Sequence, residues 1–402
     1  MDKYDPSIID NASFDYQART RLIFGNGKLN EVGKIARDLG CSRAILVTDP
    51  GLLGTGHPDR AGELLRKAGI ETSLFADVIE NPTTDCVEKC RDVAKEHKAD
   101  LLIGLGGGSA MDTAKGANFL ISNGGIMKDY QGFGRAQSPM LPMIAIPTTA
   151  GTGSECQSFA LISDASTHMK MACGDFKAAP RVALLDPELT MTLPTAVTAH
   201  TGIDAIAHAV ESAVCRKRNP FSLMYAQRAF QLAVTSLKDV LGDPANLDAR
   251  GRMLLGAAYA GMAIENSMLG AAHSMANPLT ANFNVIHGIA VGVMLPHVVR
   301  FNSAIPEART IYAELVNIAA LKGRNDDESH SVSILVDKLL ELLDIAGISR
   351  KLSDHQVRED SIGKMAEEAS SQWTRNFNPR DIEAGDFEIL YQNAWSGEVR
   401  CS

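Results

Sequence analysis

Short apolar runs alternate with longer amphipathic segments along the first 190 residues. An apolar run bounded by turn residues predicts a buried strand, and apolar positions with a 3.6-residue period predict a helix. The predicted strands cover residues 44–48, 72–75, 100–105 and 142–146, and the predicted helices cover residues 59–68, 84–97 and 111–121. Strands that alternate with helices are joined by right-handed crossovers. The pattern therefore predicts a doubly wound, mostly parallel sheet with helices on both faces.

Beyond about residue 190 the strand pattern ends, and the chain becomes a series of amphipathic segments rich in Ala, Leu and Met. A 3.6-residue apolar period predicts helices over residues 195–215, 222–241, 248–267, 285–302, 307–321 and 330–346. A chain of 402 residues exceeds the usual size of one domain. We therefore expect an α/β dinucleotide-binding domain over residues 1–190 and an all-α metal-binding and substrate domain over residues 191–402.

Composition narrows the kinds of partner that the protein can bind. Its net charge is −9, and Lys and Arg are scattered, which argues against nucleic acid or an anionic membrane surface and favours a small-molecule substrate. The seven cysteines are widely spread without CxxC spacing, so we expect reduced thiols rather than disulfides or a cysteine zinc site. No signal peptide or long apolar run is present, which predicts a soluble cytoplasmic protein.

The helical half contains a candidate set of metal ligands. Asp204 and His208 are four residues apart, so on a helix they share one face and can bind one ion. His273 and His287 bracket a second helix and its following loop, and could bring two more imidazoles to the same point. One carboxylate and three imidazoles suit divalent Fe or Zn.

A glycine-rich turn follows one of the predicted strands. Residues 106–109 (GGGS) connect the strand ending at Leu105 to a helix that carries Asp112 and Lys115. Glycines let the backbone approach a diphosphate closely, and the helix N-terminus supplies unpaired amides. The same glycines would also serve a tight turn without any ligand, because neither a GxGxxG fingerprint nor a Walker loop is present.

Two further polar positions follow strands at the edge where ligands of such sheets collect. Residues 147–155 (PTTAGTGSE) offer hydroxyls and amides for the phosphates and nicotinamide ribose of a dinucleotide. Asp49 follows the strand 44–48, where its carboxylate could accept hydrogen bonds from a ribose diol and repel the extra phosphate of NADP. NAD is therefore the expected cofactor, although Asp49 could also be a turn residue before Pro50.

Motifs along nearly the whole chain resemble those of the iron-containing (group III) alcohol dehydrogenases, a family that includes lactaldehyde reductases and propanediol dehydrogenases. The matching segments are LIFGNGKLNEVG, VTD, ENPT, GLGGGSAMDTAK, IPTTAGTGSE, KMA, ALLDPELTMTLP, LPHVVRFN and NPR. The resemblance implies the dehydroquinate synthase-like/iron-containing alcohol dehydrogenase fold, with NAD and Fe(II), or Zn(II), in a cleft between the domains. It also implies a homodimer or a higher homo-oligomer.

The resemblance further implies the roles of individual residues. The metal ligands would be Asp204, His208, His273 and His287. The cofactor contacts would be Asp49, Asn81, Gly107, Gly108, Ser109, Asp112, Thr148, Thr149, Thr152 and Lys170. One position departs from the family. Many members have a second histidine in the motif HxMxHP, near nicotinamide and substrate, where this chain has Asn277 in HSMANP. Asn cannot titrate near neutral pH, which puts a proton relay at that position in doubt.

These features predict hydride transfer between the nicotinamide and a primary alcohol or short aldehyde whose oxygen is polarised by the metal. Three alternatives stay open. A maleylacetate reductase-like enzyme shares the cofactor loops without needing the full ligand set. A dehydroquinate synthase-like lyase would need more Lys and Arg near the metal than residues 200–290 provide. A non-catalytic NAD-binding sensor is the third alternative.

Overall fold

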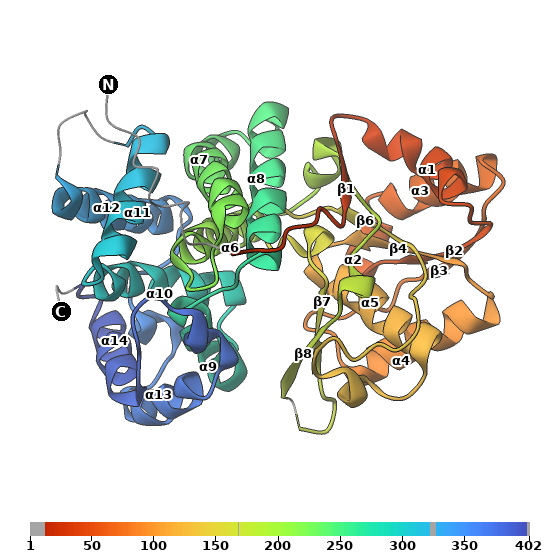
Figure 1. Cartoon of the computed structure of the whole chain (residues 1–402). Helices are drawn as coiled ribbons and strands as arrows, with labels where there is room; N and C mark the ends of the chain where they lie inside the picture. Colours follow the sequence, from red (N-terminus) through yellow and green to blue (C-terminus); the bar gives the residue numbers. More distant parts are fainter. Residues whose placement is uncertain (1–12, 168, 322–326, 400–402) are drawn as a thin grey trace. The chain divides into compact units, whose positions relative to one another are not determined.

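The computed structural model describes residues 13–167, 169–321 and 327–399, and divides into two compact units (Figure 1). An α/β unit comprises Ala18–Pro194. A helical unit comprises Thr195–Ser402 together with the N-terminal segment Met1–Gln17.

A parallel sheet forms the centre of the α/β unit. Its strands among the described residues are β1 (Arg21–Phe24), β2 (Arg43–Val47), β3 (Glu71–Phe75), β4 (Leu101–Gly106), β6 (Met143–Pro147) and β9 (Val182–Leu185). They lie in the order β1-β9-β6-β4-β2-β3, and every neighbouring pair is parallel. The carboxyl ends of β2, β4 and β6 therefore lie along one edge, because neighbouring parallel strands run in the same direction.

Alternate side chains of these strands enter two different cores. Leu46 and Ile103 pack on the face covered by α1 (Val32–Asp38) and α3 (His57–Lys67). Their neighbours Ile45 and Leu102 pack on the opposite face, against α4 (Thr84–Glu96) and α5 (Gly108–Asn123). A strand buried on both faces reads as a continuous apolar run. The predicted doubly wound sheet is thus confirmed.

A second, three-stranded sheet lies within the same unit, and β7 and β8 are labelled in Figure 1. It consists of β5 (Gly132–Phe133), β8 (Lys170–Gly174) and β7 (Phe159–Ser163), with β7 and β8 antiparallel. The apolar pattern of these residues does not predict this sheet, because its strands are short and half exposed and contain Lys, Ser and Gly.

The helical unit contains the six helices predicted from periodicity and three more. Its described α-helices are α6 (Thr195–Val214), α7 (Pro220–Gly242), α8 (Leu247–Glu265), α9 (Ala271–Phe283), α10 (His287–Asn302), α11 (Pro306–Ile318), α12 (Glu328–Ile345), α13 (Ile362–Ser370) and α14 (Ala384–Ser396). Of the three additional helices, α9 carries His273 and ends shortly before His287, whereas α13 and α14 lie beyond the predicted set. The all-helical character expected after residue 190 is confirmed.

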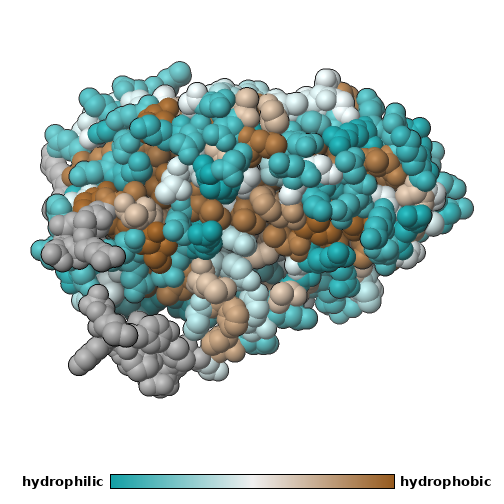
Figure 2. All heavy atoms as spheres, turned by 90° about the horizontal axis from the view of Figure 1, so that it is seen from above, coloured by the Kyte–Doolittle hydropathy of each residue, from teal (hydrophilic) through white to brown (hydrophobic). Residues whose placement is uncertain are grey.

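Residues 13–17, before the first strand, group with the helices rather than with the sheet. The Tyr16 ring stacks on Phe221 of α7 with 4.2 Å between ring centroids, and its hydroxyl lies 2.8 Å from that of Tyr225. The chain divides again at Pro194, shortly after the predicted boundary at residue 190. None of the described helices is both long and apolar enough to cross a membrane. The face drawn in Figure 2 is mostly hydrophilic, with separate hydrophobic areas on it.

Candidate functional site

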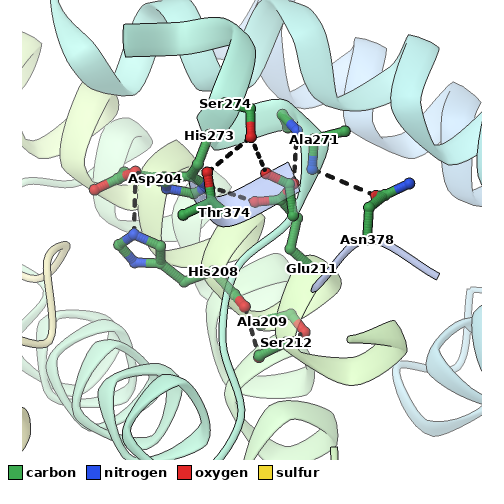
Figure 3. Close-up of polar contacts among 12 residues, drawn as sticks. Asp204, His208, Ala209, Glu211, Ser212, Ala271, His273, Ser274, Thr374 and Asn378 are labelled. Atoms are coloured by element: carbon green, nitrogen blue, oxygen red, sulfur yellow. Dashed lines mark hydrogen bonds and ion pairs between the residues drawn. The ribbon is translucent and has the colours of Figure 1, made fainter. Parts of the chain in front are cut away.

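Helix α6 holds the first two predicted metal ligands. Its sequence around them, IDAIAHAVES, places small apolar residues on every side, so the helix is buried over most of its length. Asp204 and His208 are both 5 % exposed, and His208 Nε2 lies 3.5 Å from Asp204 Oδ1. Figure 3 shows the two side chains facing each other. The spacing of four residues therefore puts a carboxylate and an imidazole together inside the unit.

Two more imidazoles reach the same carboxylate oxygen from other helices. His273 Nε2, from α9, lies 3.5 Å from Asp204 Oδ1, and His287 Nε2, from the first residue of α10, lies 3.9 Å from it. The His208 and His273 rings are nearly parallel, with centroids 4.8 Å apart. His287 is the most accessible member, with 33 % of its side chain exposed. The structure thus gathers all four predicted ligands around one oxygen atom.

The donor set fits a divalent metal ion. Asp204 Oδ1 and His273 Nε2 are buried, and neither makes a hydrogen bond within the described part of the chain. Buried polar atoms without such bonds are costly unless another partner satisfies them. Three nitrogen donors and one carboxylate oxygen are ligands typical of divalent Fe and Zn.

Electrostatics within this set favour a charged carboxylate. Burial tends to raise the pKa of Asp204, but the nearby imidazoles, with His208 foremost, hold that pKa well below its usual range. Burial tends to lower the pKa of His273, but Glu211 and Asp204 together raise it to about 9. Positive charge is therefore stabilised at this point of the molecule, as a cation site requires.

Close packing of α10 against α6 fixes the position of His287. A Cβ atom added at Gly288 would overlap the carbonyl oxygen of His200, and one added at Gly292 would overlap Ile203. Glycine at both positions lets the two helix backbones approach closely. This approach brings the first turn of α10 to the ligand set.

Glu211 is a further residue of the site, which the sequence interpretation does not include. Its Oε2 contacts His273 Nδ1 (Figure 3). Its Oε1 accepts a hydrogen bond of 2.7 Å from the backbone N–H of Ala272. Glu211 is seven residues after Asp204, so it lies on the same face of α6. That spacing is the signal that could have pointed to it.

The predicted cofactor residues all lie in the α/β unit, and many of them belong to loops that follow β2, β4 and β6 at the carboxyl edge of its parallel sheet. The distances from a Cβ atom added at each glycine to its neighbours show how closely the loops meet there. A Cβ at Gly106 would be 3.4 Å from Asp49 Oδ2, and one at Gly108 would be 2.8 Å from Thr152 Cγ2. A Cβ at Gly107 would be 3.4 Å from Thr149 Cγ2. The loops after β2, β4 and β6 are therefore neighbours. Helix α5 begins at the same place, so its N-terminus lies beside these loops.

Asp112 has protein partners of its own. Its Oδ1 accepts a hydrogen bond of 2.8 Å from Ser154 Oγ, and its Oδ2 accepts one of 3.2 Å from the backbone N–H of Leu161. Burial raises the pKa of its carboxyl, against the effect of Lys115. Lys115 donates to the backbone oxygen of Ser154 at 2.6 Å and to that of Phe159 at 2.9 Å. Both charged side chains thus hold the loop that follows β6.

Asn81 and Lys170 also meet in this unit, because Lys170 Nζ donates a hydrogen bond of 3.2 Å to Asn81 Oδ1. Asn277 belongs to the helical unit, on α9 one turn after His273. Its side-chain nitrogen donates a hydrogen bond of 2.9 Å to Gln372 Oε1. The structure thus gives Asn277 an amide partner within its own unit.

Comparison with known proteins places this site in a family. A model of the iron-containing alcohol dehydrogenases matches residues 19–187, and a model of the C-terminal region of the same family matches residues 198–395. The NAD-dependent methanol dehydrogenase of Bacillus methanolicus is 32 % identical over 376 residues, which cover 92 % of this chain and 97 % of that protein. The chain belongs to the iron-containing alcohol dehydrogenases.

Solved structures agree with this assignment. A crystal structure of 1,3-propanediol oxidoreductase matches with a TM-score of 0.92 and 31 % identity, over 95 % of this chain and 100 % of that one. Sulfoacetaldehyde reductase from Bifidobacterium kashiwanohense, solved in complex with NAD+, matches with a TM-score of 0.87 and 27 % identity, over 96 % of this chain and 100 % of that one.

Membership in the iron-containing alcohol dehydrogenases confirms three predictions made from the sequence, namely the family, the fold class and the oxidoreductase activity. The family's description and the relatives' names also agree with iron and NAD as the predicted cofactors.

Proposed function

We propose that this iron-containing alcohol dehydrogenase interconverts a primary alcohol and its aldehyde, with Asp204, His208, His273 and His287 as the ligands of one divalent metal ion. The observation that carries the proposal is the convergence of three imidazole Nε2 atoms on Asp204 Oδ1, at 3.5, 3.5 and 3.9 Å. Fe(II) is the expected metal, and Zn(II) is the alternative that the same donors accept. When bound, the ion supplies Lewis-acid polarisation of the substrate oxygen.

The four ligands divide into a buried part and an accessible part. Asp204, His208 and His273 are buried, whereas His287 is one-third exposed. The buried donors exclude water from one side of the site, so a substrate oxygen would enter beside His287. A metal-free maleylacetate reductase-like reaction would leave the buried carboxylate and imidazole atoms without a function, which is why we prefer the metal-dependent one.

The cofactor residues have distinct proposed tasks. Asp49 accepts hydrogen bonds from a ribose diol, and the backbone N–H groups of Gly107, Gly108 and Ser109 surround the diphosphate at the N-terminus of α5. Thr148, Thr149, Thr152, Asn81 and Lys170 supply the remaining polar contacts. Asp112 supports the loop that follows β6 through its hydrogen bond with Ser154. NAD supplies the hydride acceptor for alcohol oxidation.

Asn277 orients its surroundings rather than transferring protons. Its amide is held by Gln372 and cannot titrate near neutral pH. The proton released on alcohol oxidation therefore leaves by a path that does not include protonation of this side chain.

We place the protein in the cytoplasm as a homodimer or higher homo-oligomer that acts on a small molecule. The net charge of −9 supports a partner other than nucleic acid. Sedimentation of the purified chain would measure its oligomeric state directly.

The proposed function is tested by metal content and turnover together. Anaerobically purified protein should contain one divalent ion per chain and oxidise NADH with a short aldehyde, and a chelator should abolish the turnover. His273→Ala should lose the metal, whereas His355→Ala, which removes a histidine of the same unit that bonds to the Ser349 carbonyl, should keep it. Unchanged metal content in His273→Ala would refute the ligand assignment, and turnover that survives complete metal removal would refute the mechanism. A panel of alcohols and aldehydes would then identify the substrate.

A further inference from the structure

Glu211 is a buried carboxylate, 4 % exposed, with polar neighbours at the start of α9. Its Oε2 contacts the Nδ1 atom of His273, and its Oε1 accepts the backbone N–H of Ala272 at 2.7 Å. Among the described residues its ion pair is with His273, and no Lys or Arg pairs with it. When that imidazole is neutral, the buried carboxylate has no full positive charge beside it, so its retention inside the unit asks for a compensating charge.

The contact with His273 decides which ring nitrogen can act as a ligand. A carboxylate accepts hydrogen bonds, so Nδ1 carries the proton that is shared with Glu211. Once a metal ion replaces the second proton of the ring, Nε2 is the lone-pair donor, and this is the atom that lies 3.5 Å from Asp204 Oδ1. A carboxylate behind a ligand imidazole fixes its tautomer and raises its basicity.

The surrounding backbone leaves the carboxylate little freedom. A Cβ atom built at Gly270 would be 3.1 Å from Glu211 Oε1 and 3.0 Å from Asn378 Oδ1. Asn378 in turn accepts the backbone N–H of Ala271 at 3.3 Å. The first turn of α9 is thus held by two side chains, and the His273 ring is oriented from behind.

The formal charges of the site also balance. Asp204 and Glu211 contribute two negative charges, and neutral imidazoles contribute none. A divalent cation brings the sum of −1, −1 and +2 to zero. Replacing Glu211 by a neutral side chain would leave a buried net positive charge in the metal-bound protein, which a low-dielectric interior disfavours.

We propose that Glu211 is a positioning residue of the metal centre, which holds His273 in the Nδ1–H tautomer and neutralises the second charge of the bound ion. This inference rests on the proposed ligand set. It adds a fifth side chain to the metal centre. Glu211 acts through the ligand His273 and not by direct contact with the metal.

The test measures binding of Co2+ to the full-length chain by competition with a chelating indicator, with the Co2+ visible spectrum as a report on ligand geometry. Glu211→Gln keeps the shape but loses the charge, and we expect the dissociation constant to rise about 10- to 100-fold with an altered spectrum. Glu211→Asp keeps the charge but shortens the reach, and should show a smaller rise. Glu314→Gln is the matched control, because Glu314 is a partly buried helical carboxylate that bonds to Gln227, and it should bind Co2+ as the wild type does.

The outcomes separate this inference from the proposed function. If wild-type protein binds Co2+ and His273→Ala does not, while both Glu211 variants bind it with unchanged constant and spectrum, Glu211 has no positioning role although the ligand set stands. If the wild type binds no Co2+, the ligand set itself fails. Thermal unfolding of each variant without metal shows whether weaker binding reflects lost folding. A loss of stability that accounts for all of the weaker binding would also overturn the inference.

Discussion

The side-chain amide of Asn277 donates a hydrogen bond of 2.9 Å to Gln372 Oε1 and so joins α9 to the residue before the 3-10 helix Trp373–Phe377. The position one turn after His273 is therefore occupied by a neutral side chain with a neutral partner. The charge and hydrogen bonding at this position should therefore change little with pH near neutrality.

Asn277→His should introduce a titratable group at that position. Because an unperturbed histidine titrates near pH 6.5, we expect the pH profile of kcat/KM for alcohol oxidation to gain an inflection between about pH 6 and 8. Gln372→Ala is the control, since it removes the hydrogen bond without adding an ionisable group. Matching profiles for wild type and Asn277→His, at equal metal and NAD content, would show that the residue only packs the helix.

Gly288→Ala should disturb the metal site through the backbone. The new methyl group would overlap the His200 carbonyl oxygen and push the first turn of α10, with His287, away from Asp204. We expect weaker binding of a divalent ion and a loss of about 1–3 kcal/mol in the free energy of unfolding.

Gly363→Ala is the matched control for this substitution. Gly363 is also helical, but open space surrounds its built Cβ, so alanine there should be neutral or stabilising by about 0.4–1 kcal/mol. Metal titration and urea unfolding of both variants check the prediction. Wild-type metal affinity in Gly288→Ala would contradict it.

Asp49→Gly should weaken the preference for NAD over NADP. The carboxylate follows β2 and lies beside Gly106, where it would repel the additional phosphate of NADP. We expect the preference for NAD, expressed as the free-energy difference RT ln of the ratio of the two kcat/KM values, to shrink by roughly 1–3 kcal/mol. Asp59→Asn, an exposed change on α3, should leave the ratio unchanged. If the wild type used NAD and NADP equally well, Asp49 would have no role in cofactor choice and would be only a turn residue.

Glu155 should make the stability of the protein fall with rising pH. Burial raises the pKa of its carboxyl to about 7, so the folded state holds this proton more tightly than the unfolded state does. The contribution is complete below the unfolded pKa of about 4.5, and it is lost as pH rises through about 7. By this linkage, ionisation of Glu155 lowers the free energy of unfolding at pH 8 by an amount of the order of 3 kcal/mol.

Glu155→Gln removes that titration, so its stability relative to wild type should increase between pH 5 and pH 8. Urea unfolding at both values measures the change, and the exposed Glu96→Gln provides a baseline without it. An equal difference from wild type at both pH values would show that Glu155 does not titrate in this range.

Local patterns in the sequence determine much of the fold. The strand of residues 44–48 and the helix of residues 84–97 are predictable because burial on one or both faces imposes a period that neighbouring residues carry themselves. The pairing of Asp204 with His208 belongs to the same class, since four residues make about one turn of a helix. The loops after β2, β4 and β6 are expected at one edge because parallel strands share a direction.

Other features depend on contacts between distant parts of the chain. The antiparallel pairing of β7 with β8 and the packing of Tyr16 on Phe221 leave no periodic pattern in their own residues. The same holds for Glu211, which is a partner of His273 only because the tertiary structure brings the first turn of α9 to the side chain of Glu211. The sequence by itself thus determined which residue types are present and which of them share a helix face. The tertiary structure decided that His273 and His287 reach Asp204, because contacts between distant helices, such as the close packing that Gly288 and Gly292 allow between α10 and α6, bring the imidazoles to it.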